Sequence, residues 1–213
     1  MRDLLLFGSG GLARETLGAV AAVNEAAPTW RVLGIVDDNR TLHGGQVGGV
    51  PVLGGRSVLE DHPHAAVALC TGSPRDLVSR RRVPAEIGIA PERWATVVHP
   101  SAQLGPRVEL APGVVLLASV VCTADVRIGP HVVVMPATVL THDDELGAGV
   151  VVASGVRLSG AVRVGDGAYL GAGSVVREGV TVGREALVGM GAVVVADVPD
   201  GQVWAGNPAR RLR

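Results

Sequence analysis

The sequence has few aromatic residues, few cysteines and no excess of charge of either sign. Aromatic residues make up 2% of its 213 positions, so a core must be built mainly from valine, leucine, isoleucine and alanine. Nineteen basic residues stand against 20 acidic ones, a formal net charge of -1, which argues against nucleic acid or an anionic membrane as partner. Two cysteines are too few for a disulfide framework. We therefore expect a globular protein whose partners are small molecules.

Long apolar runs are also missing. The starting segment DLLLF is shorter than the core of a signal peptide, and the run from Val114 to Cys122 is far below the roughly 20 residues of a membrane helix. These absences favour a cytoplasmic protein. Glycine, in contrast, is abundant at 30 residues, which indicates many tight turns or close backbone contacts.

The first 98 residues alternate apolar strand patterns with glycine turns. DLLLF, residues 3–7, reads as a buried strand and is followed by GSGGLARE and a helical apolar pattern. Two more strand patterns, RVLGIVDDN and HAAVALCTGS, end in small or polar residues. The carboxyl ends of parallel strands meet at one edge, so we expect a nucleotide-like ligand there. Its candidate contacts follow the three strand patterns: Gly8, Gly10, Gly11, Asp37, Asp38, Thr71, Gly72 and Ser73.

Other interpretations of this region stay open. The glycines could serve only as turns, with Asp37 and Asp38 as caps of the next element. An NAD dehydrogenase is disfavoured, because about 95 residues hold only half of a two-lobed dinucleotide fold. The run Arg80 to Arg82 reads as a solvated helix face.

From Leu104 the chain follows a period of six. The segment divides into 16 units over 96 residues; the first position is Leu, Ile or Val in 15 units, and the fifth is Val, Ala, Ser or Thr in 15. Cys122 and Asp144 are the two exceptions. Helices and alternating strands lack this period, whereas a solenoid with three flat faces has it, with first-position side chains along its axis. Three units make one coil, which gives about five coils and a rod about 25 Å tall.

The repeat resembles the hexapeptide, left-handed parallel β-helix of bacterial acyltransferases. With FGSGGLARE, IVDDN, HPSA, LTHDDE and AGNPARRL, the whole chain resembles the sugar O-acyltransferase family of the sialic acid O-acetyltransferase type, which includes the bacillosamine and perosamine N-acetyltransferases. The resemblance implies a Rossmann-like α/β domain for nucleotide sugars, residues 1–98, and then a left-handed β-helix acyltransferase domain, residues 99–213. It also implies acetyl-CoA as co-substrate and a homotrimer, which apolar surface on flat prism faces favours as well.

The unit LTHDDE, residues 140–145, is the most polar repeat. Leu140 keeps the axial position, so we expect the polar side chains of the unit to point outward. His142 would then be an exposed general base whose tautomer Asp143 fixes. The resemblance implies the same roles, with His142 deprotonating an acceptor amine or hydroxyl as it attacks the thioester. Asp144 and Glu145, the latter expected at a corner, read most simply as solvated surface or as partners of a helix.

The resemblance places the acyl donor on later coils. Gly160 would offer its N–H to the thioester carbonyl as an oxyanion hole. Small residues would let pantetheine lie against the backbone, and two tail arginines could bind the CoA phosphates, although these positions also fit repeat corners, core and a solvated terminus. These candidates are Gly171, Gly189, Ala192, Arg210 and Arg211. Cys122 is axial and is expected in the core, and two repeat histidines, His131 and His142, are too few for a three-histidine zinc site, so we expect no metal.

Two positions depart from the family pattern. Leu12 stands where the bacillosamine and perosamine enzymes usually have a histidine in the glycine loop, and Val151 replaces a second histidine that contacts CoA. Different donor contacts or a longer acyl group would follow. The favoured acceptor is the amine of a nucleotide-linked amino sugar. A sugar or sialic-acid-like hydroxyl and, in another class, a non-catalytic sugar-nucleotide-binding protein are the alternatives.

Overall fold

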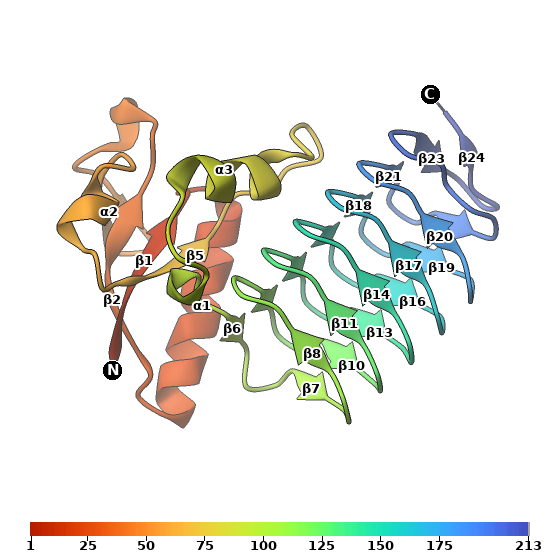
Figure 1. Cartoon of the computed structure of the whole chain (residues 1–213), viewed down its shortest axis with the longest axis horizontal. Helices are drawn as coiled ribbons and strands as arrows, with labels where there is room; N and C mark the ends of the chain where they lie inside the picture. Colours follow the sequence, from red (N-terminus) through yellow and green to blue (C-terminus); the bar gives the residue numbers. More distant parts are fainter. Residues whose placement is uncertain (213) are drawn as a thin grey trace.

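The strand patterns at the start of the chain form a five-stranded sheet in the computed structural model, which describes residues 1–212 (Figure 1). Its elements are β1 (Arg2–Phe7), α1 (Gly11–Ala26), β2 (Trp30–Val36), β3 (Gln46–Val47), β4 (Val50–Gly54), α2 (Val58–Asp61), β5 (Ala66–Leu69) and α3 (Ser79–Ile87). The strand order is β3-β4-β2-β1-β5, and only β3 is antiparallel to its neighbour. Leu4 and Leu6 pack in one apolar cluster and Leu5 in another, so both faces of the sheet are covered.

The hairpin of β3 and β4 was not expected from the sequence. Val47 pairs with Val50 across Gly48 and Gly49, whose φ angles are 58° and 79°. Two glycines between valines are the usual signal of such a turn, because both central residues need positive φ. The segment QVGGV therefore held enough information to predict this hairpin.

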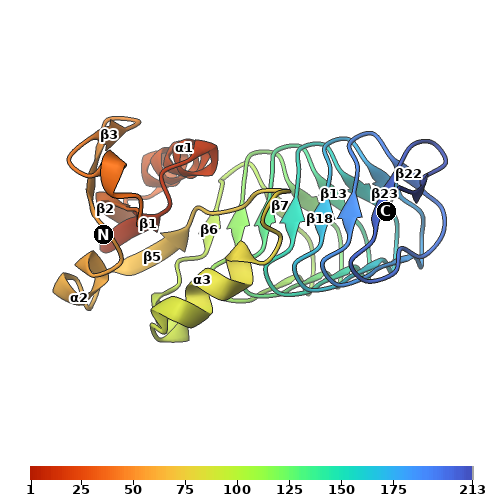
Figure 2. The same cartoon turned by 90° about the horizontal axis from the view of Figure 1, so that it is seen from above.

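The period-six segment folds into a left-handed parallel β-helix, as the resemblance implied (Figures 1 and 2). Each of its three faces is named for what lies on its outer side: the α/β domain, valine side chains or charged side chains. The covered face consists of β6 (Val97–Val98), β9 (Val115–Leu116), β12 (Val133–Val134), β15 (Val151–Val152), β18 (Tyr169–Leu170), β21 (Leu187–Val188), β23 (Val203–Ala205) and β24 (Arg210–Arg211). The valine face consists of β7 (Gln103–Leu104), β10 (Val121–Cys122), β13 (Val139–Leu140), β16 (Arg157–Leu158), β19 (Val175–Val176) and β22 (Val193–Val194). The charged face consists of β8 (Glu109–Leu110), β11 (Arg127–Ile128), β14 (Glu145–Leu146), β17 (Arg163–Val164) and β20 (Thr181–Val182).

The repeat positions take the places that the sequence predicted. First-position side chains from Leu116 to Val194 fill the axis, and Cys122 is 1% exposed among them, which confirms it as core. Fifth-position side chains lie beside them and are also buried. The fourth position of every unit from Arg107 to Gly191 has a positive φ, between 52° and 76°. Each coil therefore turns its three corners through a left-handed residue, which L-residues tolerate there because the corner hydrogen bonds repeat from coil to coil.

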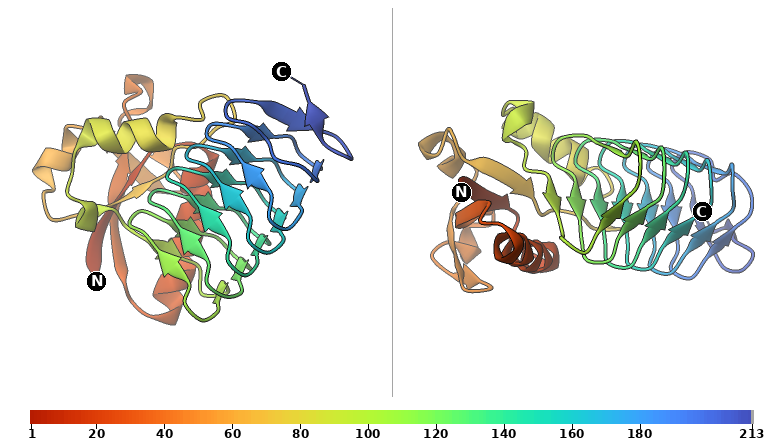
Figure 3. Two further views of the ribbon diagram at one scale, coloured as in Figure 1. Left: turned by 45° about the vertical axis from the view of Figure 1, so that its right-hand side comes forward. Right: turned by 90° about the horizontal axis from the view of Figure 1, so that it is seen from below.

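The α/β domain packs on the covered face near its first coils (Figure 3). The outward residues Val97, Val115, Val133 and Val151 share one apolar cluster with α1. The prediction of a solvated face for Arg80 to Arg82 is wrong for Arg80, which is 1% exposed. Its guanidinium donates to the carbonyls of Leu69, Thr71 and His131, the last in the β-helix, at 3.1 Å for Leu69 and 2.5 Å for His131. The backbone carbonyls replace water around the charge.

Two further properties concern residues 1–212 only. None of the helices in this part of the chain combines the length and the apolar character that crossing a membrane requires. Within the same residues, no three histidine, cysteine, aspartate or glutamate side chains come together in a way that could hold a metal ion.

Candidate functional site

His142 lies on the corner that joins β13 of the valine face to β14 of the charged face. Its Nδ1 is 2.8 Å from Oδ2 of Asp143, and the two side chains are 66% and 62% exposed. Asp143 is the left-handed residue of the corner, with a φ of 63°, and this conformation turns its carboxylate back toward the preceding side chain. The geometry therefore places an exposed imidazole within hydrogen-bonding distance of a carboxylate, which is the arrangement that the sequence predicted.

Asp144 contradicts the expectation that the polar side chains of this unit point outward. Its side chain is fully buried inside the β-helix. Its Oδ2 accepts the N–H of Thr141 at 2.7 Å, and its Oδ1 accepts the N–H of Val162 in the next coil at 2.9 Å. Burial raises the pKa of Asp144 to about 7, although these N–H groups and His142 lower it. The fifth position stays interior even for an acid because two backbone donors satisfy the carboxylate.

Gly160 is the third-position residue directly after His142 in the stack of coils. A Cβ at this position would lie 2.2 Å from Cε1 and 2.4 Å from Nε2 of His142, so only a glycine leaves room for the imidazole ring. Within residues 1–212 the N–H of Gly160 donates to no acceptor. The structure therefore brings a free backbone donor and the candidate base together, which is the pairing that an oxyanion hole beside a base requires.

The glycine loop and the ends of β2 and β5 meet at one edge of the sheet. Gly8 has a φ of 102°, and a Cβ there would lie 3.0 Å from the carbonyl oxygen of Cys70 and 3.3 Å from Thr71. Gly10 is the residue before α1, and an added Cβ there would meet open space, whereas one at Gly11 would lie 4.0 Å from Nη2 of Arg14. The start of a helix with free N–H groups and open space is a suitable place for a phosphate.

The two acids of this edge are already bound within the domain. Oδ2 of Asp37 accepts the N–H and hydroxyl of Ser9 at 2.9 and 2.5 Å, so Asp37 holds the glycine loop. Asp38 pairs with Arg56 at 2.7 Å, and this hydrogen bond lowers the pKa of Asp38. Asp37 therefore fixes the shape of the edge, whereas Asp38 is held in its charged form by Arg56. Thr71, Gly72 and Ser73 follow β5 at the same edge.

The candidate donor residues do not meet His142 within one chain. Gly171 and Gly189 lie on the corner between the covered and valine faces, and Gly160 alone touches the imidazole. Ala192 occupies an interior fifth position and is fully buried, so its side chain belongs to the core and lines no surface. Arg210 and Arg211 are exposed in β24 at the last coil. The β-helix separates the two groups because His142 lies opposite the covered face.

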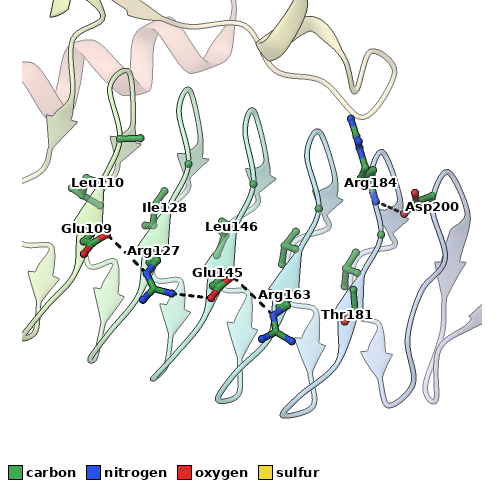
Figure 4. Close-up of a pocket in the computed structure, with 17 residues that line it drawn as sticks. Glu109, Leu110, Arg127, Ile128, Glu145, Leu146, Arg163, Thr181, Arg184 and Asp200 are labelled. Atoms are coloured by element: carbon green, nitrogen blue, oxygen red, sulfur yellow. Dashed lines mark hydrogen bonds and ion pairs between the residues drawn. The ribbon is translucent and has the colours of Figure 1, made fainter. Parts of the chain in front are cut away.

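A groove of about 580 Å³ runs along the charged face and the corner that follows it at Gly129, Gly147 and Gly165 (Figure 4). Glu145 lies in β14 with its side chain on this face, and not at a corner as the sequence analysis expected. Arg127 and Glu145 are 3.0 Å apart, and Glu109 and Arg163 extend the ladder at 3.9 and 4.0 Å. The charges are paired along the groove, and none of the predicted site residues lines it.

The fold and the sequence are similar to known proteins over the whole chain. The PglD N-terminal domain matches residues 3–81, and the hexapeptide repeat of succinyl-transferase matches residues 161–196. The acetyltransferase domain of PglB from Neisseria gonorrhoeae FA1090 is 31% identical, with a TM-score of 0.85 over 100% of both chains. PerB from Caulobacter crescentus, solved in complex with CoA and GDP-perosamine, is 31% identical, with a TM-score of 0.86 over 100% of this chain and 98% of that one. The chain belongs to the hexapeptide-repeat sugar acyltransferases.

Membership of the sugar acyltransferases confirms two predictions, the fold class and the assignment as an acetyltransferase. A search among curated proteins finds no matching sequence. Leu12 and Val151, the two departures from the family pattern, lie near each other: a Cβ at Gly72 would be 3.8 Å from Leu12 and 3.7 Å from Val151. In this sugar acyltransferase the junction of the two domains is therefore apolar at both positions.

Sequence reasoning missed Asp144 and Arg80 as buried groups near the candidate sites. The signal for Asp144 was present, because Asp144 is the one acid among the fifth positions of 16 units. No comparable signal marks Arg80, which contacts His131 51 residues away. His131 itself is half-buried against Trp94 with ring centroids 4.8 Å apart, and burial lowers its pKa to about 4, so it remains neutral at pH 7.

Proposed function

We propose that this protein transfers the acetyl group of acetyl-CoA to the amine of a nucleotide-linked amino sugar, with His142 as general base. The observation that carries the proposal is the exposed His142–Asp143 pair, with 2.8 Å between Nδ1 and Oδ2, beside the free N–H of Gly160. Support for donor and acceptor comes from PerB, which was solved with CoA and GDP-perosamine, and from the PglB domain, which was solved with acetyl coenzyme A.

The His142–Asp143 hydrogen bond determines which ring nitrogen reacts. Nδ1–H donates to the carboxylate of Asp143, which leaves the lone pair of Nε2 free. Nε2 takes a proton from the acceptor amine while the amine nitrogen forms its bond to the thioester carbon. The C–S bond then breaks, the sulfur leaves with the electron pair, and His142 returns the proton to it. No covalent enzyme intermediate is needed, and no metal enters this proposal.

Gly160 supplies the second half of this mechanism. As the nitrogen attacks, the thioester oxygen gains negative charge, and a fixed N–H donor stabilises that charge more than it stabilises the substrate. The Cα of Gly160 packs against the imidazole of His142, so the distance between the base and the N–H of Gly160 is fixed. Asp143 acts through His142 and does not contact the substrate in this proposal.

The complete site requires more than one chain. The outward residues of the valine face are Gln103, Val121, Val139, Arg157, Val175 and Val193, and its valines are half-buried or exposed. The covered face is occupied by the α/β domain and the charged face is polar, so the valine face is the one suited to an apolar contact between copies. We propose a homotrimer in which three valine faces surround a common axis.

This arrangement explains the separation of the candidate residues. Three prisms packed by their valine faces place the corner of His142 next to the corner of a neighbour that carries Gly171 and Gly189. In such a trimer the α/β domain of that neighbour, with Gly10 and Gly11 at the start of α1, would lie beside the same cleft. Acetyl-CoA would then lie between two prisms, and the nucleotide part of the acceptor would bind the edge formed by the glycine loop, Asp38 and Thr71.

The experiment is a thiol-release assay with acetyl-CoA against amino and hydroxy sugars, each free and nucleotide-linked. We expect turnover with a nucleotide-linked amino sugar and much slower turnover with the matching free sugar. Turnover confined to hydroxyl acceptors would identify an O-acetyltransferase instead. Binding of a nucleotide sugar with no binding or turnover of acetyl-CoA would replace the enzyme by a binding protein.

Sedimentation at micromolar concentration tests the shared site separately. We expect a trimer for the wild type and dissociation for Val139→Arg, which places a charge on the valine face. Thr181→Arg, on the charged face, is the matched control and should leave the trimer intact. A stable, fully active monomer would contradict the shared site.

A further inference from the structure

The column of fifth-position side chains that contains Asp144 is otherwise made of valine. Its members in successive coils are Val108, Val126, Asp144, Val162, Val180 and Val198, and from Val126 onward each is at most 2% exposed. A carboxylate in an apolar column is costly unless hydrogen bonds satisfy it. Since valine fills this place in the other coils, the β-helix itself does not need an acid there.

Asp144 changes the hydrogen bonds of the residue that precedes His142. At every other second position from Gly105 to Arg177, the N–H donates to a carbonyl of the following coil, as Thr123 does to Leu140 at 3.0 Å. The N–H of Thr141 donates to Asp144 instead, at 2.7 Å. The carbonyl of Leu158, left without its usual donor, accepts the hydroxyl of Thr141 at 3.0 Å. The turn of His142 is thus the one place in this series where side chains replace a ladder bond.

The second oxygen of Asp144 reaches the turn of Gly160. Oδ1 accepts the N–H of Val162, two residues after Gly160, at 2.9 Å. At comparable fifth positions the N–H stays within its own turn, as Ser174 does by donating to Gly171 at 3.1 Å. One buried carboxylate therefore ties together the turn that carries the candidate base and the turn that carries the candidate oxyanion donor.

We propose that Asp144 is a positioning residue of the acyl transfer, holding the turns of His142 and Gly160 together and placing a negative charge beneath the His142–Asp143 pair. The charge stabilises the imidazolium that forms when His142 takes the proton of the acceptor. This inference rests on the proposed function. Asp144 touches no substrate in this arrangement and acts through His142.

The surroundings of Asp144 contain few other charges. His142 and Asp143 share its turn, and in the preceding coils Asp125 is paired with Arg107 at 2.5 Å. Cys122 on β10 lies beneath, and burial raises the pKa of its thiol to about 12, so it stays neutral. In the following coil the residues from 158 to 162 carry no charge. Above neutral pH, where Asp144 is ionised, its charge therefore acts mainly on the His142–Asp143 pair.

The test is Asp144→Val, which completes the valine column and allows Thr141 to regain the ladder bond. At pH 8 we expect an unchanged or higher Tm, an intact trimer, and a kcat about 10- to 100-fold lower, since small displacements of a base are costly. The rising limb of kcat against pH should move to lower pH, because the imidazolium loses a neighbouring negative charge. Ser174→Val, at another buried polar fifth position, is the control and should change neither kcat nor the limb.

The outcomes separate the two proposals. A wild-type kcat and an unmoved pH limb in Asp144→Val would overturn the role of Asp144 while the proposed function stands. A fall in Tm of the size of a core defect would overturn it too, because it would make Asp144 an element of the fold. Absence of turnover in the wild type with every acceptor would contradict the proposed function itself, and the role of Asp144 with it.

Discussion

Two regions of the molecule bury a charged side chain among backbone groups, and they differ in what the charge connects. At the domain junction, Arg80 donates to carbonyls of the α/β domain and to His131 of the β-helix. At the corner of His142, Asp144 accepts N–H groups from two successive coils. Burial lowers the pKa of Arg80 to about 10, so it remains charged at neutral pH, and raises that of Asp144 to about 7.

The two regions differ in the hydrogen bonds that would remain if the charged side chain were removed. The coils around Asp144 show a complete alternative, a valine with ladder bonds, whereas removal of Arg80 leaves three carbonyls without a donor. The junction around Arg80 is therefore expected to govern stability, and the corner around Asp144 to govern activity.

His142→Ala should affect activity most and stability least. We expect kcat to fall by roughly 10² to 10⁴, the usual contribution of a positioned general base, with the trimer, the affinity for CoA and the Tm nearly unchanged because the side chain is exposed. In the wild type the rate should rise with pH as an imidazole loses its proton, and this limb should vanish in the variant. His64→Ala, at an exposed histidine of the α/β domain, is the control. Wild-type turnover by His142→Ala would remove the base from the mechanism.

Arg80→Met should affect stability most. The variant keeps an unbranched apolar stem but leaves the carbonyls of Leu69, Thr71 and His131 without their donor, so we expect a loss of about 2–4 kcal/mol in the free energy of unfolding. Denaturant unfolding measures it. The control is Arg82→Met, which removes only an exposed ion pair with Asp76 and should cost less than about 0.5 kcal/mol. Equal losses in the two variants would show that burial of Arg80 adds nothing to the junction.

The same division explains what the sequence could and could not predict. The β-helix was predictable because every unit repeats the same steric requirement, an apolar first position and a small fifth one. The pair His142 and Asp143 was predictable because adjacent residues at a corner must lie close together. Asp144 was expected to point outward because it is polar, although its fifth position in the repeat is an interior one. The N–H groups of Thr141 and Val162 that satisfy its carboxylate come together only when the coils stack.

Arg80 shows a different limit of sequence reasoning. A run of three arginines on a short helix has the pattern of a solvated face, and Arg81 and Arg82 do pair with the surface acids Glu185 and Asp76. Nothing local distinguishes Arg80 from them. Its partners are carbonyls at the end of β5 and on a corner of the β-helix, and those segments meet only through the packing of the two domains.

The stability of the wild type should depend on pH differently from that of Asp144→Val, in which valine completes the buried column. The pKa of Asp144 is about 7 in the folded protein against an ordinary value of 3.8, so the folded state binds a proton more tightly. As pH rises from 4 to 7 the unfolded state ionises first, and the free energy of unfolding should fall by up to about 1.4 kcal/mol per pH unit. Asp144→Val should lack this fall. His131, whose pKa is lowered, acts in the opposite direction in both proteins and cancels in the difference. Parallel stability curves would contradict an ionisation of Asp144 in this range.

Gly160→Ala should move the base without removing it. A Cβ at this position would lie 2.2 to 2.9 Å from three ring atoms of His142, so the imidazole must turn away from its place. We expect kcat to fall about 10- to 100-fold with little change in Tm, because the ring is exposed and free to move. Gly18→Ala, on an exposed side of α1 where a Cβ meets nothing, is the control and should leave kcat unchanged.

The decisive comparison is the double variant that combines Gly160→Ala with His142→Ala. If the alanine acts by displacing the ring, it should cost almost nothing further once the ring is absent. Additive losses would instead place the effect on the N–H of residue 160, so the cycle separates the role of Gly160 as space for the base from its role as oxyanion donor.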